Sequence, residues 1–374
     1  MQLTETIKLY LTNEQKTLIR QAMDEYIQAV NDIVAVGISG TSIKKFSSKD
    51  VKADLPSAIR AQVARDARSI LAKYYKTCHK AVLTNRRLKE KDKDVSILAP
   101  NLPIMKRPCC YINNQNFKIT ENGLSFPMMV DGKSKRITVQ TSMTSRQKEL
   151  LQSKLGTLRL VLKDYAIVAQ ITYEVLIPEL LPGDKIMGVD IGIKCPAVSY
   201  TSDGEVKFYG NGRKNKYLRR HYKYMRKKLQ SKKKPKAVKR IGDKEQRIMR
   251  DTDHKISASI VKEAVAKGAF VIKVEKLANI RKTTRTSRKN NYSLHTWSFY
   301  RLLGFIEYKA KLAGIEVIYV DPRYTSQTCP VCSKRNHARD RQYVCKCGYR
   351  KHRDIVGAIN ICNSTEIVCN RQSA

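Results

Sequence analysis

Residues 324–363, YTSQTCPVCSKRNHARDRQYVCKCGYRKHRDIVGAINICN, place four cysteines at the spacing of metal ligands. Cys329 and Cys332 form one close pair, and Cys345 and Cys347 form a second pair after twelve intervening residues. Thiolate ligands in tetrahedral geometry bind Zn²⁺ and fold small modules that have little core of their own. The spacing therefore predicts a structural zinc site in a ribbon-like module.

The second cysteine pair is tighter than the common Cys-x2-Cys, because a single residue separates its members. This leaves open a ligand swap in which His337 or His352 replaces one of the two thiols. The module is also strongly basic, which favours contact with phosphate. Its basic side chains are Lys334, Arg335, Arg339, Arg341, Lys346, Arg350, Lys351 and Arg353.

An amphipathic helix follows the module directly and begins with an acid, Asp354. Ile355, Ala358, Ile359 and Cys362 recur at helical spacing behind it. One interpretation is that Asp354 only caps the helix. If it belongs to a metal site instead, its carboxylate needs partners from upstream parts of the chain.

Upstream of the module, apolar strands alternate with helices, and Ser202–Gly204 (SDG) is a tight turn signal. We expect strands at 185–193, 196–200 and 205–209, a very basic helical stretch at 214–267, a strand at 269–274, a helix at 297–313 and a strand at 314–320. Three antiparallel strands followed by alternating helices and strands are typical of an RNase H-like α/β fold.

Two more acids stand on these strands. Asp190 lies between Val189 and Ile191 in the first strand, where an unpaired charge is costly. Glu275 follows the fourth strand, where a solvated strand end is the alternative. Together with Asp354, the three carboxylates can converge at one edge of the sheet and hold two Mg²⁺ (or Mn²⁺) ions for phosphodiester hydrolysis.

The first half has a different pattern. Alternation over residues 3–11 predicts a strand, a capping-box motif at Thr12–Gln15 begins a long helix, and Pro56 begins a second one. The period is two over residues 102–139, with turn signals at 121–123 and 131–132, and a short helix and strands around 158–161 and 166–177 follow. The pattern predicts a β-rich unit that opens with one strand and contains two inserted helices.

The composition favours a nucleic-acid-binding protein. The 374-residue chain has a formal net charge of +40, which implies a polyanionic partner, with a membrane surface as the alternative to nucleic acid. No run of about 18 apolar residues predicts a transmembrane helix, and the first residues lack a signal-peptide pattern. The scattered cysteines fit a reducing compartment, so we expect a cytoplasmic protein.

The charge is densest in residues 211–250, which hold 18 Lys or Arg against two acids. This favours binding to the backbone of a duplex or a structured RNA. A second basic loop at 283–291 is interpreted as a lid or strand guide, or as an ordinary flexible loop. Three amides suit adenine edges but are also common in cores and on solvated surfaces. The candidate contacts are Arg213, Lys214, Arg219, Arg220, Lys223, Arg226, Lys227, Lys228, Arg285, Arg288 and Lys289, and the amides Gln62, Asn113 and Asn114.

The chain resembles TnpB, the RNA-guided nuclease encoded by bacterial insertion sequences and an ancestor-like relative of type V CRISPR effectors. The matching stretches are GVDIGIKCPAV (188–198), VIKVEKL (271–277), VDPRYTSQTCPVC (320–332) and HRDIVGAINI (352–361), with a weaker echo at LPSAIRAQVARDARSIL (55–71). It departs from the family pattern at Cys345-x-Cys347 and at His352, where an aspartate is frequent.

The resemblance implies a domain plan and a function. A wedge-like β-barrel (1–12 and 96–183) would be interrupted by a helical recognition insert (13–95). A RuvC-like nuclease core (184–324 and 353–374) would contain a zinc-binding target-nucleic-acid-binding insert (325–352). Asp190, Glu275 and Asp354 would be catalytic and bind Mg²⁺, and the four cysteines would hold zinc. An element-derived guide RNA would direct cutting of double-stranded DNA beside a short flanking motif, at the bacterial nucleoid.

Two other functions remain open at this point. One is a nuclease-dead, RNA-guided DNA-binding repressor, which would have lost at least one of the three carboxylates. The other is an RNase H-like transposase that joins strands without a guide.

Overall fold

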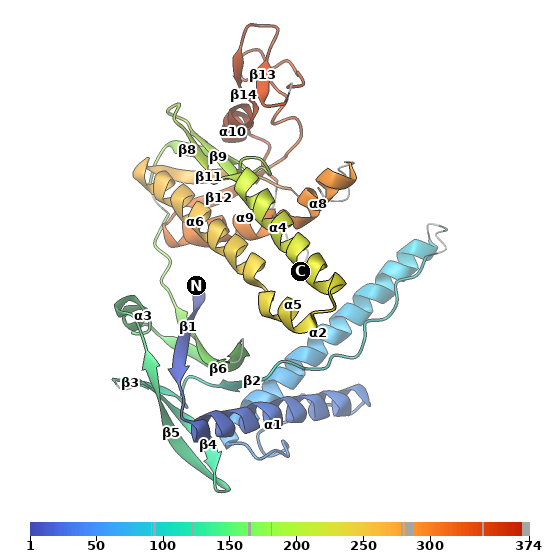
Figure 1. Ribbon diagram of the computed structural model, residues 1–374, viewed down its shortest axis with the longest axis vertical. Coiled ribbons are helices and arrows are strands. Elements are labelled where there is room, and N and C mark those ends of the chain that lie inside the picture. Colours follow the sequence, from blue (N-terminus) through green and yellow to red (C-terminus); the bar gives the residue numbers. More distant parts are fainter. Residues whose placement is uncertain are drawn as a thin grey trace. The chain divides into compact units, whose positions relative to one another are not determined.

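The computed structural model divides the chain into two compact units, Met1–Val175 and Leu176–Ala374 (Figure 1). It describes residues 1–368 except 91, 93–94, 122, 164–165, 181, 278–279, 281–286 and 339, and except the side chains of residues 288 and 289. Each unit has its own principal sheet and its own hydrophobic core. Of the helices described, none is long and apolar enough to cross a membrane.

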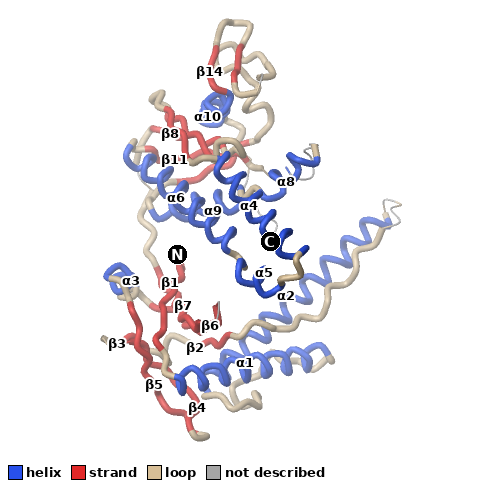
Figure 2. The backbone as a smooth tube through the Cα atoms, viewed as in Figure 1, coloured by secondary structure: helices blue, strands red, loops and turns tan. Residues whose placement is uncertain are grey.

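The first unit contains an antiparallel sheet in the order β2-β6-β7-β1-β5-β4-β3 (Figure 2). Its strands are β1 (Gln2–Tyr10), β2 (Cys109–Ile112), β3 (Lys118–Thr120), β4 (Gly123–Val130), β5 (Lys133–Ser142), β6 (Leu155–Lys163) and β7 (Ala166–Glu174). Among the described residues no strand pairing joins β2 to β3, so the sheet is a half-barrel rather than the closed barrel that we expected. The end strands β2 and β3 are both short. Helices, rather than further strands, cover the core of this unit.

Three helices belong to this unit: α1 (Asn13–Ile38), α2 (Ser57–Lys89) and α3 (Ser145–Leu150). The predicted capping box is present, because Thr12 Oγ1 accepts a hydrogen bond from the Gln15 N–H (3.2 Å) and Gln15 Oε1 accepts one from the Thr12 N–H (3.3 Å). Met23 of α1 and Val63 of α2 are buried in the same core as Phe126 of the sheet. The helices expected as an insert therefore share one core with the sheet.

The second unit is built on a five-stranded sheet in the order β10-β9-β8-β11-β12. Its strands are β8 (Lys185–Asp190), β9 (Ala197–Thr201), β10 (Val206–Tyr209), β11 (Ala269–Glu275) and β12 (Glu316–Val320). β9 is antiparallel to both β8 and β10, whereas β11 runs parallel to both β8 and β12. The meander of β8, β9 and β10 was predicted from the sequence, whereas the place of β11 between β8 and β12 is seen only in the structure.

Helices lie on both faces of this sheet (Figure 1). α6 (Lys244–Ala266) and α9 (Phe299–Leu312) cover one face, and α10 (Arg353–Asn363) covers the other. The remaining described helices of this unit are α4 (Gly212–Ser231), α5 (Pro235–Ile241) and α8 (Arg288–Thr296). Met187 of β8 packs with α6 and α9, and its neighbour Gly188 lies against α10 on the opposite face. The expected basic helical stretch is three helices, because Pro235 begins α5 and Gly242, at φ 45°, ends it.

Between β12 and α10 the chain forms the cysteine module. Its hairpin pairs β13 (Gln342–Val344) with β14 (Arg350–His352). The buried core of the module is small and consists of Cys329, Tyr343, Cys345 and Val356. So small a core needs another source of stability, which a metal ion would supply.

Candidate active site

The structure brings Asp190, Glu275 and Asp354 together at one edge of the five-stranded sheet. β8 and β11 are parallel neighbours with Val189 opposite Val274, so their last residues, Asp190 and Glu275, reach the same edge. Helix α10 passes so close to this edge that a Cβ atom on Gly357 would lie 2.9 Å from Asp190 Oδ2. Asp354, one turn earlier on α10, therefore faces the same region.

The position of α10 is fixed by close packing and by hydrogen bonds. A Cβ atom on Gly188 of β8 would lie 2.3 Å from the Ala358 carbonyl oxygen, so only glycine fits at this crossing. Near the other end of the helix, Lys273 Nζ donates hydrogen bonds to the carbonyl oxygens of Cys362 (2.9 Å) and Ser364 (2.8 Å). These contacts tie the Asp354 helix to the strands that carry Asp190 and Glu275.

The three carboxylates are electrostatically coupled. Burial raises the pKa of Asp190 well above its usual range, and the nearby charges of Glu275 and Asp354 raise it further. Burial also raises the pKa of Glu275 to about 7, against the opposing effect of a hydrogen bond from Thr325 Oγ1. Carboxylates that repel one another in this way are stabilised by cations, and hard divalent cations prefer oxygen ligands.

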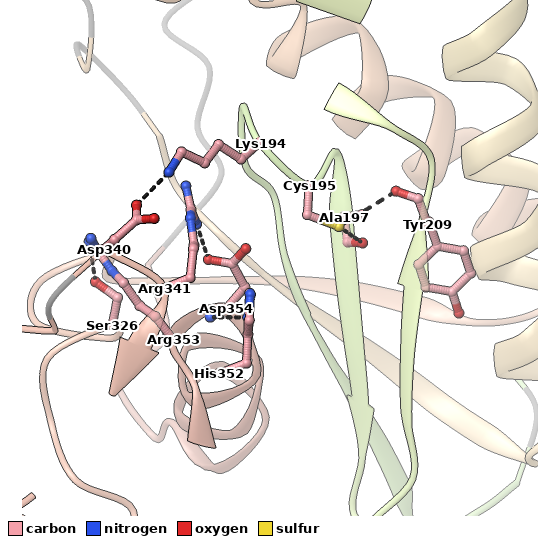
Figure 3. Close-up of polar contacts among 10 residues, drawn as sticks. All are labelled: Lys194, Cys195, Ala197, Tyr209, Ser326, Asp340, Arg341, His352, Arg353 and Asp354. Carbon is pink, nitrogen blue, oxygen red and sulfur yellow. Dashed lines mark hydrogen bonds and ion pairs between the residues drawn. The ribbon is translucent and has the colours of Figure 1, made fainter. Parts of the chain in front are cut away.

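Asp354 is not the cap of its helix. His352 is the N-cap, because its Nδ1 accepts a hydrogen bond from the Asp354 backbone N–H (3.2 Å). The Asp354 side chain is buried and forms an ion pair with Arg341 of the cysteine module (Figure 3). The alternative in which Asp354 serves only as a cap is therefore wrong. Glu275 is half-buried at its strand end, and its carboxylate accepts a hydrogen bond from Thr325 Oγ1.

Sequence reasoning missed the inward role of Arg341. The pattern placed it among the phosphate-contacting cations, whereas its guanidinium faces Asp354 and its Nε is buried with no hydrogen-bond partner among the described residues. A second ion pair, between Lys194 after β8 and Asp340, also joins the cysteine module to the sheet (Figure 3). Two consecutive residues of the module thus contact the carboxylate edge, a feature that only the fold reveals.

The four cysteine sulfur atoms lie within 4.8 Å of one another. Cys329 Sγ is 3.7 Å from Cys347 Sγ, and Cys332 Sγ is 3.5 Å from Cys345 Sγ. A tetrahedral Zn²⁺ with Zn–S bonds of about 2.3 Å places its sulfur ligands about 3.8 Å apart. The spacing of the thiols therefore fits a zinc ion.

Neighbouring groups support the same assignment. Asn336 Nδ2 donates a hydrogen bond to Cys345 Sγ (3.2 Å). The thiols influence one another, so that the backbone N–H of Cys347 and the neighbouring thiols lower the pKa of Cys345, while hydrogen bonding with Cys345 raises that of Cys347. Within the described residues no histidine joins the cluster, and His352 is engaged in capping α10. The geometry therefore does not favour the alternative ligand swap.

The basic helix α4 presents most of its predicted contacts to solvent. The exposed ones are Arg213, Lys214, Lys223, Lys227 and Lys228, whereas Arg219 and Arg220 are half-buried. Lys223 Nζ also lies 3.9 Å from the centre of the Tyr292 ring. Arg226 was predicted to contact nucleic acid, but it forms an ion pair with the buried Glu245 and so holds α4 against α6.

The remaining predicted contacts give mixed results. Gln62 is wrong as a base-reading residue, because it is 5 % exposed on the face of α2 that packs into the core. Asn113 accepts a hydrogen bond from Asn116 within a turn, and Asn114 is exposed. Arg285 lies outside the described residues. Arg288 and Lys289 belong to α8, but their side chains also lie outside what is described.

Two family profiles match the second half of the chain. Residues 170–281 match a family described as "probable transposase" (OrfB_IS605), and residues 299–361 match the Cas12f1-like TNB domain. These two segments contain Asp190, Glu275, Asp354 and all four clustered cysteines. The matched region therefore includes both candidate sites.

Two relatives each match less than half of the chain. The chain is 34% identical over 164 residues to the TnpB-like protein MJ0751 of Methanocaldococcus jannaschii, covering 41% of this chain and 59% of that protein. It is 30% identical over 196 residues to the CRISPR-associated endodeoxyribonuclease Cas12f1 of Sulfoacidibacillus thermotolerans, covering 48% of this chain and 45% of that protein. The chain thus spans about half the length of these relatives.

Solved structures extend the likeness in fold to almost the whole chain. A Cas12f1–sgRNA–target DNA complex superposes with a TM-score of 0.60 at 16% identity, covering 94% of this chain and 82% of that one. The mini-RNA-guided endonuclease CRISPR-Cas_phi3 superposes with a TM-score of 0.54 at 10% identity, covering 96% and 92%. At such low identity the likeness establishes a shared α/β fold.

Proposed function

We propose that this chain, whose residues 170–281 and 299–361 match the two family profiles, belongs to the TnpB family and is an RNA-guided DNA endonuclease of a transposable element. In this proposal a guide RNA and target double-stranded DNA are its partners, and it cuts DNA beside a short flanking motif at the bacterial nucleoid. The observation that carries the proposal is the convergence of Asp190, Glu275 and Asp354 from three separate elements at one sheet edge. A DNA-binding repressor without nuclease activity would not need this arrangement.

We assign the domains on the same basis. The five-stranded sheet with α10 is the RuvC-type, RNase H-like core (184–324 and 353–374), and the cysteine module is its target-nucleic-acid-binding insert (325–352). The half-barrel (1–12 and 96–183) is the wedge-like domain, with α1 and α2 as recognition helices (13–95). The strand order of the second unit and the fold likeness to Cas12 effectors support this assignment.

The carboxylates would hold two Mg²⁺ (or Mn²⁺) ions. The chemistry that such ions supply is activation of the attacking water and stabilisation of the leaving 3′ oxygen. The chain's own residues prepare the site for them: Thr325 orients the Glu275 carboxylate by a hydrogen bond, and Arg341 orients that of Asp354 by an ion pair. Gly357 leaves room for the Asp190 carboxylate against α10. The ligands are thus held in place before a cation arrives.

The four clustered cysteines would hold a structural Zn²⁺. Their contribution is to fix the loop that carries Arg341 and Asp340, and so to position the basic surface of the module beside the carboxylates. The exposed cations of α4 would neutralise phosphates without reading sequence, which leaves sequence selection to base pairing with the guide.

The test is to express the protein with its native flanking DNA, to sequence the RNA that co-purifies, and to add matched duplex DNA with Mg²⁺. We expect bound RNA and cutting of both strands. Asp190→Ala should lower the cutting rate by a factor on the order of a thousand while RNA and target binding persist. Asp251→Ala, which removes an exposed acid on α6, is the matched control and should cut normally.

Each failure has its own meaning. If no RNA co-purifies, the guided mechanism is wrong and the transposase alternative gains. If RNA binds but the wild-type chain does not cut, the repressor alternative gains. If Asp190→Ala still cuts, the assignment of the carboxylates is wrong.

A further inference from the structure

A polar groove lies next to the carboxylates, between the loop after β12, the first turn of the cysteine module and the end of α10. Its volume is about 680 Å³, within the range of roughly 300–1,000 Å³ that small-molecule sites occupy. Tyr324 and Arg335 line it from the module, and Asn360 and Asn363 line it from α10. We call it the Tyr324 groove.

Tyr324 and Arg335 form a flat platform in this groove. The guanidinium carbon of Arg335 lies 3.6 Å from the centre of the Tyr324 ring, which is stacking distance. Tyr324 nevertheless remains 43% exposed. An aromatic ring supported on one side by a guanidinium and open to solvent is a surface on which an unpaired nucleobase can stack.

The backbone holds this platform in an unusual conformation. Tyr324 has φ 59°, in the left-handed region that a bulky aromatic residue rarely adopts. Its carbonyl oxygen accepts hydrogen bonds from the N–H groups of Gln327 (2.8 Å) and Thr328 (2.9 Å). Arg335 is fixed in turn, because it pairs with Thr328 in an isolated β-bridge. Local strain that the surroundings maintain in this way is typical of binding sites.

The groove is also connected to the candidate catalytic edge. Thr325 lines the groove, and its hydroxyl donates the hydrogen bond to Glu275. Asn360 Nδ2 holds the same loop by donating to the carbonyl oxygens of Thr325 (2.6 Å) and Thr328 (2.8 Å). Arg323 lies 3.9 Å from Asp321 but keeps 80% of its side chain exposed, so it supplies a cation for a phosphate at the groove, which Asp321 and Glu366 also line. A nucleotide in the groove would therefore lie next to the carboxylates.

From these contacts we infer that the Tyr324 groove binds one unpaired deoxynucleotide of the DNA strand being presented to Asp190, Glu275 and Asp354. Its base stacks on the Tyr324–Arg335 pair, and its phosphate lies toward Arg323. Tyr324 is then a positioning residue for the strand to be cut. The effect of Tyr324 on cutting rests on the proposed nuclease function. Binding of the base can be measured whether or not the protein cuts DNA.

The first experiment measures stacking directly. The full-length chain with Asp190→Ala is mixed with a single-stranded oligodeoxynucleotide that contains 2-aminopurine, whose fluorescence falls when it stacks. We expect quenching that Tyr324→Leu removes and Tyr324→Phe preserves, because only the ring is required. Tyr300→Leu is the control, since Tyr300 is exposed to a similar extent (57%) on α9 in the same unit. Unchanged quenching in Tyr324→Leu overturns the proposal, and quenching by an oligoribonucleotide alone overturns the assignment to DNA.

The second experiment measures cutting by the guide-loaded protein in single turnover. We expect Tyr324→Leu to cut roughly tenfold more slowly at saturating target, the order of effect expected for loss of one stacked base, with target affinity unchanged. Equal rates for Tyr324→Leu and Tyr300→Leu contradict the positioning role. If the wild-type chain does not cut matched DNA, the proposed nuclease function fails, and the quenching result alone decides the groove. If Tyr324→Leu loses zinc, Tyr324→Asn, which removes the ring and tolerates the left-handed backbone conformation, takes its place in both experiments.

Discussion

The two candidate metal sites of the second unit differ in almost every physical respect. The four thiols come from residues 329–347, whereas the three carboxylates come from elements spread over residues 190–354. The sulfur atoms converge on one another within 4.8 Å. The carboxylates line a sheet edge where Asp190 and Glu275 are only partly buried. The first is a closed site of the structural type, and the second is open, as a site that must admit substrate has to be.

This difference teaches where each kind of residue matters. A thiol ligand contributes to folding, because the module has a core of only a few buried side chains among the described residues. A carboxylate ligand contributes to chemistry and carries an electrostatic cost, since burial and its neighbours raise the pKa of Asp190. We therefore expect the loss of a thiol to destabilise the module and the loss of a carboxylate to leave the fold intact. The predictions below test this contrast in order of decreasing effect.

The largest effect should come from Cys329→Ser. Removing one thiol from a structural zinc site forfeits much of a binding free energy on the order of 10 kcal/mol, so the module should unfold and cutting should stop. Zinc content per chain and limited proteolysis within residues 325–352 would measure this. Cys78→Ser makes the same chemical change outside the module and should keep full zinc and full activity. A Cys329→Ser chain with one zinc ion and a protected module would refute the closed site.

A smaller but still large effect should follow Gly188→Ala. The new methyl carbon would lie 2.3 Å from the Ala358 carbonyl oxygen and 2.4 Å from the Cys362 nitrogen, so α10 would have to shift away from β8. We expect a loss of about 3 kcal/mol in the free energy of unfolding and loss of cutting, with zinc retained. Gly304→Ala on α9 is the control, because nothing lies within 4 Å of its Cβ position. It should stabilise the helix by up to about 1 kcal/mol.

The same contrast explains what the sequence could predict. The thiols were found from spacing alone, because a zinc ribbon is a local motif. The meander of β8, β9 and β10 was also predictable, since short apolar runs separated by turn signals identify strands. The position of β11 between β8 and β12 comes from the structure alone. The turn at Asp131 and Gly132, with φ values of 51° and 68°, follows from local chemistry in the same way.

Side-chain direction could not be predicted. Nothing in the sequence distinguishes Arg341 from the other cations of its module, and only the packing of the module on α10 turns it toward Asp354. Gln62 is the opposite case, because a side chain predicted to reach outward to a base lies inward. Its amide suggested a base contact, but Gln62 is on the face of α2 that packs into the core. The half-barrel also eluded prediction, because alternation identifies strands but does not tell which pair closes a sheet.

Arg341→Leu tests the link between the two sites, because Arg341 belongs to the cysteine module and pairs with Asp354 of the carboxylate site. The change leaves Asp354 buried, 8% exposed at its side chain, without its partner. We expect a loss of about 3 kcal/mol in the free energy of unfolding, at the low end for a buried pair because Arg341 is 30% exposed. Mg²⁺ should restore more stability to this variant than to the wild-type chain, since a cation would replace the guanidinium. Urea unfolding with and without Mg²⁺ measures both effects, and equal responses to Mg²⁺ would mean that no cation replaces the guanidinium at Asp354.

The smallest effect should come from Lys194→Ala, which removes the other link between the module and the sheet. Both side chains of the Lys194–Asp340 pair are more than half exposed, so solvent and salt screen it. The hydrogen bond from Lys194 lowers the pKa of Asp340, so the pair stabilises the fold at neutral pH, and this contribution is lost as the pH falls and Asp340 takes up a proton. We expect a fall in melting temperature of no more than about 2 °C at pH 7, which shrinks further in acid or in high salt. A larger fall, or one that persists in acid, would mean that the module depends on this exposed pair as much as on Arg341. The buried Arg341–Asp354 pair would then stabilise the module no more than the exposed Lys194–Asp340 pair does.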